Sequence, residues 1–201
     1  TDDCMIVKAS CHRVVMSGSF ICSITSIENP MEKLDLTKTY KSYYTAKAKP
    51  EIIAVDSAQY LSVTGKGAPA GKIFAQKIQA LFSTAYAIKF KFKALDKDFV
   101  VPKLECLWWF DEQTYGRLSI VEAPLSVPRS EWEYRLLLRM PDYVTQQKVE
   151  GGIQNTFAKK QLPFVKDIEL YTMNEGKCVQ VLHVGSFASE PDTLNRLGRF
   201  M

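Results

Sequence analysis

A single carboxylate, Glu105, stands inside the apolar run LECLWWF, which spans residues 104–110. An ionised carboxylate that loses its water needs a partner, or its proton affinity rises. Strand alternation places Glu105 and Trp109 on one face and Trp108 on the other, so we expect Trp108 to lie in the core. A carboxylate beside aromatic rings favours a flat cationic ligand. We predict that Glu105 and Trp109 bind a ligand; the alternative is a surface ion pair of Glu105 with Lys103 or with an arginine, on an edge strand.

A second carboxylate follows the same pattern in the run KDIELY, where Glu169 and Tyr171 share a strand face. Two glutamates could divide hydrolytic chemistry, because one protonated acid can donate a proton while the other orients water. This predicts Glu105 and Glu169 as a catalytic pair if the protein is an enzyme. The alternative for Glu169 is a plain salt bridge with Lys166 or Lys177.

The remaining reactive side chains fit no known catalytic or metal-binding motif. His183 in VLHVGS could contact a ligand or act as a general base, although a lone strand histidine is usually a hydrogen-bonded structural residue. Ser186 lacks the G-x-S-x-G context of a hydrolase nucleophile, and GKGAPAG lacks the ending of a phosphate-binding loop. The five cysteines show no C-x-x-C pair. We therefore expect no metal and no cofactor.

The composition is that of an ordinary globular protein, with 46% hydrophobic and 24% charged residues in a chain of 201. No apolar run is long enough to span a bilayer and no signal peptide is evident, so we expect a cytoplasmic protein without a membrane partner. Lysines and tyrosines alternate in residues 37–50, a pattern that could grip single-stranded nucleic acid. We favour tyrosines packed on the domain edge, since no nucleic-acid-binding motif follows.

Periodicity predicts an α+β fold of alternating strands and helices. The expected strands cover residues 52–63, 98–110, 132–144, 166–173 and 178–187, and the expected helices cover 72–90 and 145–160. The sequence NEGK at 174–177 predicts a hairpin turn between the last two strands. Residues 1–30 differ from the rest and are treated as an N-terminal extension that is either paired to a sheet edge or poorly ordered.

Five separated motifs resemble one known family. YLSVTGKGAPAG, AYAIKF, VPKLECLWWF, RMPDYV and EGKCVQVLHVGSFASEPDTL are similar, in this order, to the small-molecule-binding domain of GyrI-like proteins. The resemblance covers residues 31–201 and implies tandem strand-helix-strand-strand modules, one at about 50–125 and one at about 130–201, related by a pseudo-twofold axis with a central ligand groove. It also implies a closing strand pair after the helix that begins at Pro191; either module two is incomplete there, or residues 4–25 occupy that edge.

The resemblance implies two classes of function. The first is binding of lipophilic, cationic or flat aromatic small molecules in an acidic, aromatic-lined groove, for sensing, sequestration or detoxification. The second is a hydrolase that opens the cyclopropane ring of DNA-alkylating compounds. The ligand-binding residues are then predicted to be Glu105, Trp109, Tyr86, Tyr171 and His183. Contact with DNA gyrase rests on the family name alone, and no direct nucleic-acid binding is expected.

Overall fold

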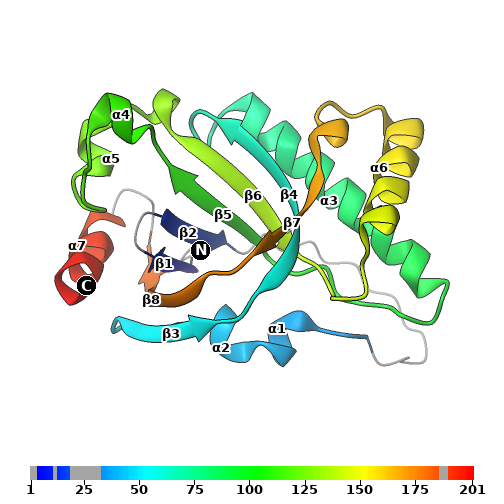
Figure 1. Cartoon of the computed structure of the whole chain (residues 1–201), viewed down its shortest axis with the longest axis horizontal. Coiled ribbons are helices and arrows are strands. Elements are labelled where there is room, and N and C mark those ends of the chain that lie inside the picture. Colours follow the sequence, from blue (N-terminus) through cyan, green and yellow to red (C-terminus); the bar gives the residue numbers. More distant parts are fainter. Residues whose placement is uncertain (1–3, 11–12, 19–32, 186–189) are drawn as a thin grey trace.

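The computed structural model of the chain describes residues 4–10, 13–18, 33–185 and 190–201, which form an α+β fold around one curved antiparallel sheet (Figure 1). The strand order is β3-β8-β1-β2-β5-β6-β4-β7. The strands are β1 (Cys4–Ser10), β2 (Arg13–Gly18), β3 (Glu51–Val55), β4 (Ala58–Lys66), β5 (Leu104–Trp109), β6 (Glu133–Arg139), β7 (Glu169–Met173) and β8 (Gly176–Val184).

One long ladder explains how the sheet curls. β3 pairs with β8 and β4 pairs with β7, and the register is the same on both sides of the break between them, from Glu51 opposite Gln180 to Ser62 opposite Glu169. Only residues 56–57 join β3 to β4, although these strands stand far apart in the strand order. The sheet must therefore bend until its two ends meet at this break.

Two local predictions fail at the same break. The single strand expected over residues 52–63 is divided into β3 and β4. The hairpin predicted at 174–177 is wrong, because β7 pairs with β4 while β8 pairs with β3 and β1. Gly176 has a φ of 68°, but the chain does not reverse there and runs on from β7 into β8 in the other half of the sheet. Long-range pairing thus replaces the local turn that the sequence suggests.

The two N-terminal strands lie in the middle of the sheet. β1 pairs with β8, and β2 pairs with both β1 and β5. This confirms that residues 4–10 pair with the strand edge of β8, one of the two alternatives for the extension. The pairing of β2 with β5 was not predicted, and it joins the two halves of the sheet.

Three long helices cover one face of the sheet: α3 (Lys72–Lys93), α6 (Gln146–Lys160) and α7 (Glu190–Phe200). The buried side of α3 repeats every three or four residues, at Ala80, Leu81, Thr84, Ala85 and Ile88. α3 and α6 pack on the core beneath β4, β5 and β6, and α7 packs on Val7 and Val181. Cross-strand register places Val181 and Cys106 on the same face, so these helices form one layer.

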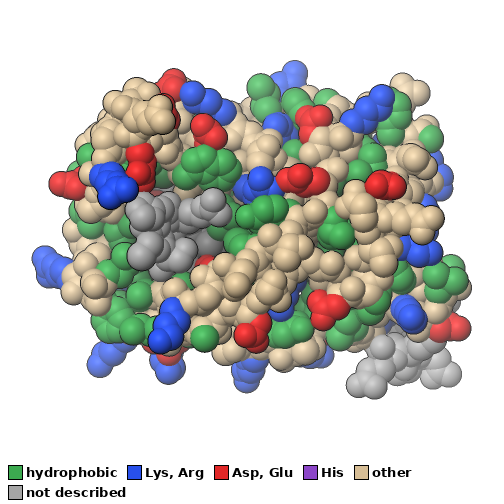
Figure 2. Space-filling model, in the orientation of Figure 1, with side chains coloured by type: hydrophobic (Ala, Val, Ile, Leu, Met, Phe, Trp, Pro, Cys, Tyr) green, Lys and Arg blue, Asp and Glu red, His purple; other side chains and the backbone are tan. Residues whose placement is uncertain are grey.

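Two short helices, α1 (Leu36–Thr39) and α2 (Lys41–Tyr44), lie on the opposite face. The connection from β5 to β6 carries α4 (Glu112–Tyr115) and α5 (Ala123–Ser126). Among the described residues, no helix has the length and apolar character needed to cross a membrane. Figure 2 shows basic and acidic side chains interspersed over the face in view.

Candidate functional site

Glu105 lies on β5 with its side chain on the face away from the long helices. Its neighbours Cys106 and Trp108 belong to the core beneath α3, whereas Leu107 and Trp109 belong to a separate cluster on the opposite face. The predicted alternation is therefore confirmed, and Trp108 lies in the core with 7% of its surface exposed. Glu105 itself is only 1% exposed. A surface ion pair is excluded by this burial.

Two tyrosine hydroxyls meet at the buried carboxylate. Tyr43, from α2, donates a hydrogen bond from its hydroxyl to Glu105 Oε2. The same hydroxyl lies 3.1 Å from the hydroxyl of Tyr60 on β4. Tyr43 is 5% exposed and Tyr60 is fully buried. A chain of polar groups from Tyr60 through Tyr43 to Glu105 is thus buried within the protein.

The segment that carries Tyr43 is held down from both ends. The Asp35 side chain caps α1 by accepting from the Thr37 amide at 3.0 Å. At the other end, Gln180 Nε2 donates to the backbone carbonyls of Ser42 and Thr45, at 3.3 and 3.1 Å. These bonds fix α1 and α2 over the sheet, so Tyr43 reaches Glu105 from a segment 62 residues earlier in the chain.

The burial that hides the carboxylate also keeps the tyrosines protonated. Desolvation by burial raises the pKa of Tyr43 well above its usual value, and the negative charge of Glu105 raises it further. Burial, followed by the charge of Glu105, raises the pKa of Tyr60 in the same way. Both groups are neutral near pH 7 and can act as hydrogen-bond donors toward a carboxylate.

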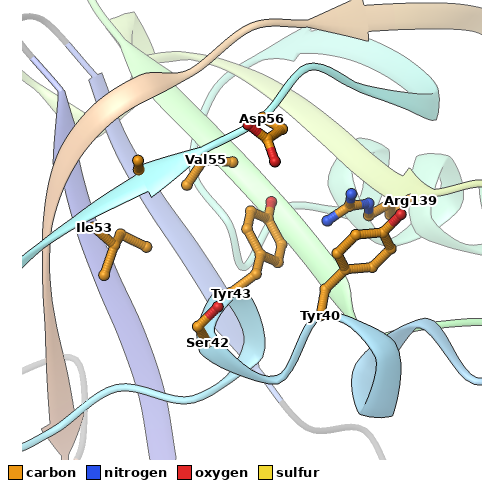
Figure 3. A pocket seen from close by; sticks show the side chains of 8 residues that line it. Tyr40, Ser42, Tyr43, Ile53, Val55, Asp56 and Arg139 are labelled. Carbon is orange, nitrogen blue, oxygen red and sulfur yellow. The ribbon is translucent and has the colours of Figure 1, made fainter.

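A small pocket borders Tyr43 on its other side (Figure 3). It encloses about 80 Å³ and is lined by Tyr40, Ser42, Tyr43, Ile53, Ala54, Val55, Asp56 and Arg139. The Arg139 guanidinium carbon stands 3.6 Å from the centre of the Tyr40 ring and 5.1 Å from that of Tyr43. This volume is below the roughly 300 Å³ at which pockets begin to hold drug-sized ligands.

Trp109, Tyr171 and Glu169 lie on the same face of the sheet as Glu105. Trp109 and Tyr171 pack against the apolar cluster that includes Tyr60. Trp109 Nε1 donates to Glu133 Oε2 at 2.9 Å. Glu169 forms an ion pair with Arg135, and 53% of the Glu169 side chain is exposed. Since β6 and β4 stand between Glu105 and Glu169, about 14 Å of sheet separates the two carboxylates.

Tyr86 and His183 lie away from Glu105. Tyr86 is on α3, 43% exposed, and its ring lies 6.2 Å from that of Phe90. α3 covers the other face of the sheet, so the structure does not bring Tyr86 to the carboxylate. His183 is buried on the α7 side, where its Nδ1 lies 2.8 Å from the Thr193 hydroxyl. This hydrogen bond is the structural role that a lone strand histidine usually has.

Sequence reasoning missed the groups that surround Glu105 most closely. Tyr43 and Tyr40 belong to the lysine and tyrosine cluster at 37–50, which was expected to pack on the domain edge. The sequence feature that could have indicated them is Asp35, a helix-capping residue that precedes the tyrosines and marks the start of a short helix. Tyr60 and Arg139 lie opposite each other on β4 and β6, a register that only the assembled sheet reveals.

Comparison with solved structures finds similar proteins from Listeria innocua. Crystal structures of a hydrolase from this organism match with 34% sequence identity and TM-scores of 0.71 and 0.72, over 84% and 85% of this chain and 83% and 80% of the matched chains. An uncharacterised conserved protein from the same organism matches with 35% identity and a TM-score of 0.73, over 84% of this chain and 80% of its own. No family model and no curated protein matches the sequence.

Proposed function

Because this chain belongs to the same family as the Listeria innocua hydrolase, we propose that it is a hydrolase that reacts at Glu105. The observation that carries the proposal is the buried Glu105 carboxylate, which accepts a hydrogen bond from Tyr43. A buried carboxylate that is oriented by a neutral hydrogen-bond donor is suited to proton transfer, because the carboxyl group itself can change between its charged and neutral forms. Sequence identity of this level also makes a shared fold and related chemistry the simplest expectation.

We propose that the substrate is a compound with a strained cyclopropane conjugated to a carbonyl, as the GyrI-like resemblance implies. Water attacks a ring carbon, the new carbon–oxygen bond replaces a ring carbon–carbon bond, and that electron pair moves into the conjugated carbonyl. Glu105 takes the proton that the attacking water loses. The carbonyl oxygen, which gains negative charge, takes a proton from solvent or from a tyrosine hydroxyl.

Access to Glu105 requires movement of α1 and α2 in this proposal. Tyr43 closes the carboxylate from the pocket side, and the pocket of about 80 Å³ is too small for an aromatic natural product. The two helices are short, and hydrogen bonds from one Gln180 amide hold the end of α2. Displacing this segment would uncover the carboxylate, on the sheet face that also carries the partly exposed Trp109 and Tyr171.

The two-glutamate mechanism predicted from sequence is a variant of this proposal. Glu169 lies on the same sheet face but is paired with Arg135 and partly exposed. We therefore assign proton transfer to Glu105 and treat Glu169 as a test of the mechanism. Loss of turnover in Glu169→Gln would support the catalytic pair, and retention would support Glu105 acting with the tyrosines.

The experiment is incubation of the protein with a cyclopropane-bearing DNA-alkylating compound, with the ring-opened product measured by liquid chromatography and mass spectrometry. The wild-type protein is expected to form product faster than buffer alone. Glu105→Gln, which keeps the side-chain shape, should lower the rate by about 100-fold or more. Glu150→Gln, at an exposed position of α6, is the matched control and should keep the wild-type rate. A folded Glu105→Gln protein with full turnover would refute the assignment.

Binding without turnover is the second candidate function. Its support is the grouping of Glu105 with the rings of Tyr43 and Tyr60, which suits a flat lipophilic cation. Such a ligand would bind to the wild-type protein and be recovered unchanged. Saturable binding of the cyclopropane compound with no ring-opened product would favour this sensing or sequestering role.

We also propose that the fold is an internal duplication around the break in the long ladder. The strand order β7-β4-β6-β5 on one side is matched by β3-β8-β1-β2 on the other. α3 follows β4 and α7 follows β8, on the same face of the sheet, which supports a pseudo-twofold relation. In this arrangement β1 and β2 occupy the positions equivalent to β6 and β5. Superposition of the two four-strand sets tests the relation.

A further inference from the structure

The guanidinium of Arg139 is buried without a hydrogen-bonding partner in the part of the chain that the structure describes. Arg139 is 5% exposed, and its recorded contacts there are with the rings of Tyr40 and Tyr43. By contrast, Arg135 on the same strand donates to Ser62 and Glu169. A guanidinium carries five N–H donors and stays charged at any pH the fold survives. No described protein group accepts a hydrogen bond from it. Its charge acts on the nearby Tyr44 and Tyr60, whose pKa values it lowers against the larger effects of burial and of Glu105.

The donors of Arg139 point into the pocket beside Tyr43. Figure 3 shows the guanidinium nitrogens directed toward the space between the Tyr40 and Tyr43 rings. The Tyr40 ring supports the guanidinium from one side, which restricts the orientation of its planar fork. The charged donor of Arg139 thus faces a partly open pocket of about 80 Å³.

The other walls narrow the chemistry of the occupant. Ile53 and Val55 provide an apolar side, with Val55 7% exposed. Asp56 lies at the solvent-exposed connection between β3 and β4, where water weakens but does not remove the repulsion between its carboxylate and an anion in the pocket. A cation would be repelled by Arg139, and a neutral group would leave the fork without a charged acceptor. A planar carboxylate with a short apolar part matches both the fork and the apolar wall.

We propose that this pocket is a binding site for the carboxylate group of a small organic acid, which accepts two parallel hydrogen bonds from the Arg139 guanidinium. The acid's short apolar part packs against Ile53 and Val55. Tyr43 forms a wall shared with the Glu105 site, so an occupant would border the segment that covers Glu105. The proposal does not depend on hydrolase activity, because it rests on Arg139 and the pocket alone.

Acetate is the probe, and acetamide is its neutral counterpart of the same shape. Each is titrated into ¹⁵N-labelled protein at constant ionic strength and low chloride, and amide shifts are followed by nuclear magnetic resonance. Acetate should shift the signals of residues 40–43, 53–56 and 139 in a saturable way. Acetamide should bind at least about ten-fold more weakly, since a charge-assisted pair of hydrogen bonds is lost.

Substitutions distinguish the contribution of the Arg139 guanidinium to acetate binding from that of the other pocket residues. Arg139→Gln should weaken acetate binding by at least about ten-fold, and Arg139→Lys should keep the charge but lose most of the two-pronged binding. Asp56→Asn should tighten acetate binding by roughly two- to five-fold, because a nearby negative charge is removed. Arg199→Gln, at an exposed position of α7, is the control and should leave acetate binding unchanged.

Equal binding of acetate and acetamide would overturn the proposal. So would unchanged acetate affinity in a folded Arg139→Gln protein. If Arg139→Gln fails to fold, Asp56→Asn decides, because its position on an exposed connection leaves the core intact. Unchanged or weaker acetate affinity in Asp56→Asn would then refute a carboxylate site at this pocket.

Discussion

Removing one oxygen atom from Tyr43 should destabilise the fold through Glu105. Tyr43→Phe keeps the ring that packs beside Tyr44 and Cys178 but removes the hydroxyl that donates to the carboxylate. Because Glu105 is 1% exposed, water cannot readily replace the lost donor. Hydrogen bonds to charged groups contribute about 1.5–3 kcal/mol, so we expect the free energy of unfolding to fall by about this amount.

Urea unfolding at pH 7, followed by circular dichroism, measures this change for four proteins: wild type, Tyr43→Phe, Glu105→Gln and the double variant. Glu105→Gln should keep or raise stability, since it removes a buried charge. The cost of Tyr43→Phe should then shrink by about 1 kcal/mol or more when Glu105 is already glutamine. That coupling is the signature of a hydroxyl that acts on the charge.

Tyr171→Phe provides the matched control. Tyr171 lies on the same sheet face, and its hydroxyl has no hydrogen bond among the described residues. Its loss should change stability by less than about 0.5 kcal/mol. If Tyr43→Phe costs no more than Tyr171→Phe, or if the Tyr43 and Glu105 effects simply add, the hydrogen bond does not stabilise the buried carboxylate as we infer.

Three further outcomes are expected. The pKa values of Tyr43 and Tyr60 are raised in the folded protein, so the unfolded chain loses these protons first, near pH 10, and the free energy of unfolding should fall as pH rises above 10. The difference in the free energy of unfolding between wild type and Tyr43→Phe should therefore be smaller at pH 10.5 than at pH 7, as measured by urea unfolding. Burial raises the pKa of Glu190, against smaller opposing effects of Arg129 and His183, so its proton stabilises the fold below the usual carboxyl pKa and this gain is lost as pH rises; Glu190→Gln should therefore raise the melting temperature at pH 7 but not at pH 4. Gly152→Ala would place a methyl group 2.5 Å from Ile88 Cγ1 where α6 meets α3, and it should lower the free energy of unfolding in urea by about 1–3 kcal/mol. In a protein that already carries Ile88→Ala, the same Gly152→Ala substitution should cost much less, because the smaller side chain relieves the clash.

The sequence predicted what depends on short-range periodicity. The two-residue period of a strand correctly separated Glu105 from Trp108, and the spacing of apolar residues correctly located α3. It could not predict that Tyr43 reaches Glu105, since that contact joins segments with no shared local pattern. The hairpin predicted before Gly176 failed for the same reason: pairing of β8 with β3 and β1 outweighs a turn signal in four residues.

The central position of β1 and β2 has a consequence for how the chain folds. β1 pairs with β8, and these strands are separated by almost the whole length of the sequence. Contacts between such distant segments form slowly, because a very long loop must close first. During synthesis β1 must wait for β8, the last strand of the sheet, and until then β1 and β3 each have an open edge to which other chains could attach. Aggregation during refolding should therefore depend on how fast the two ends of the chain meet.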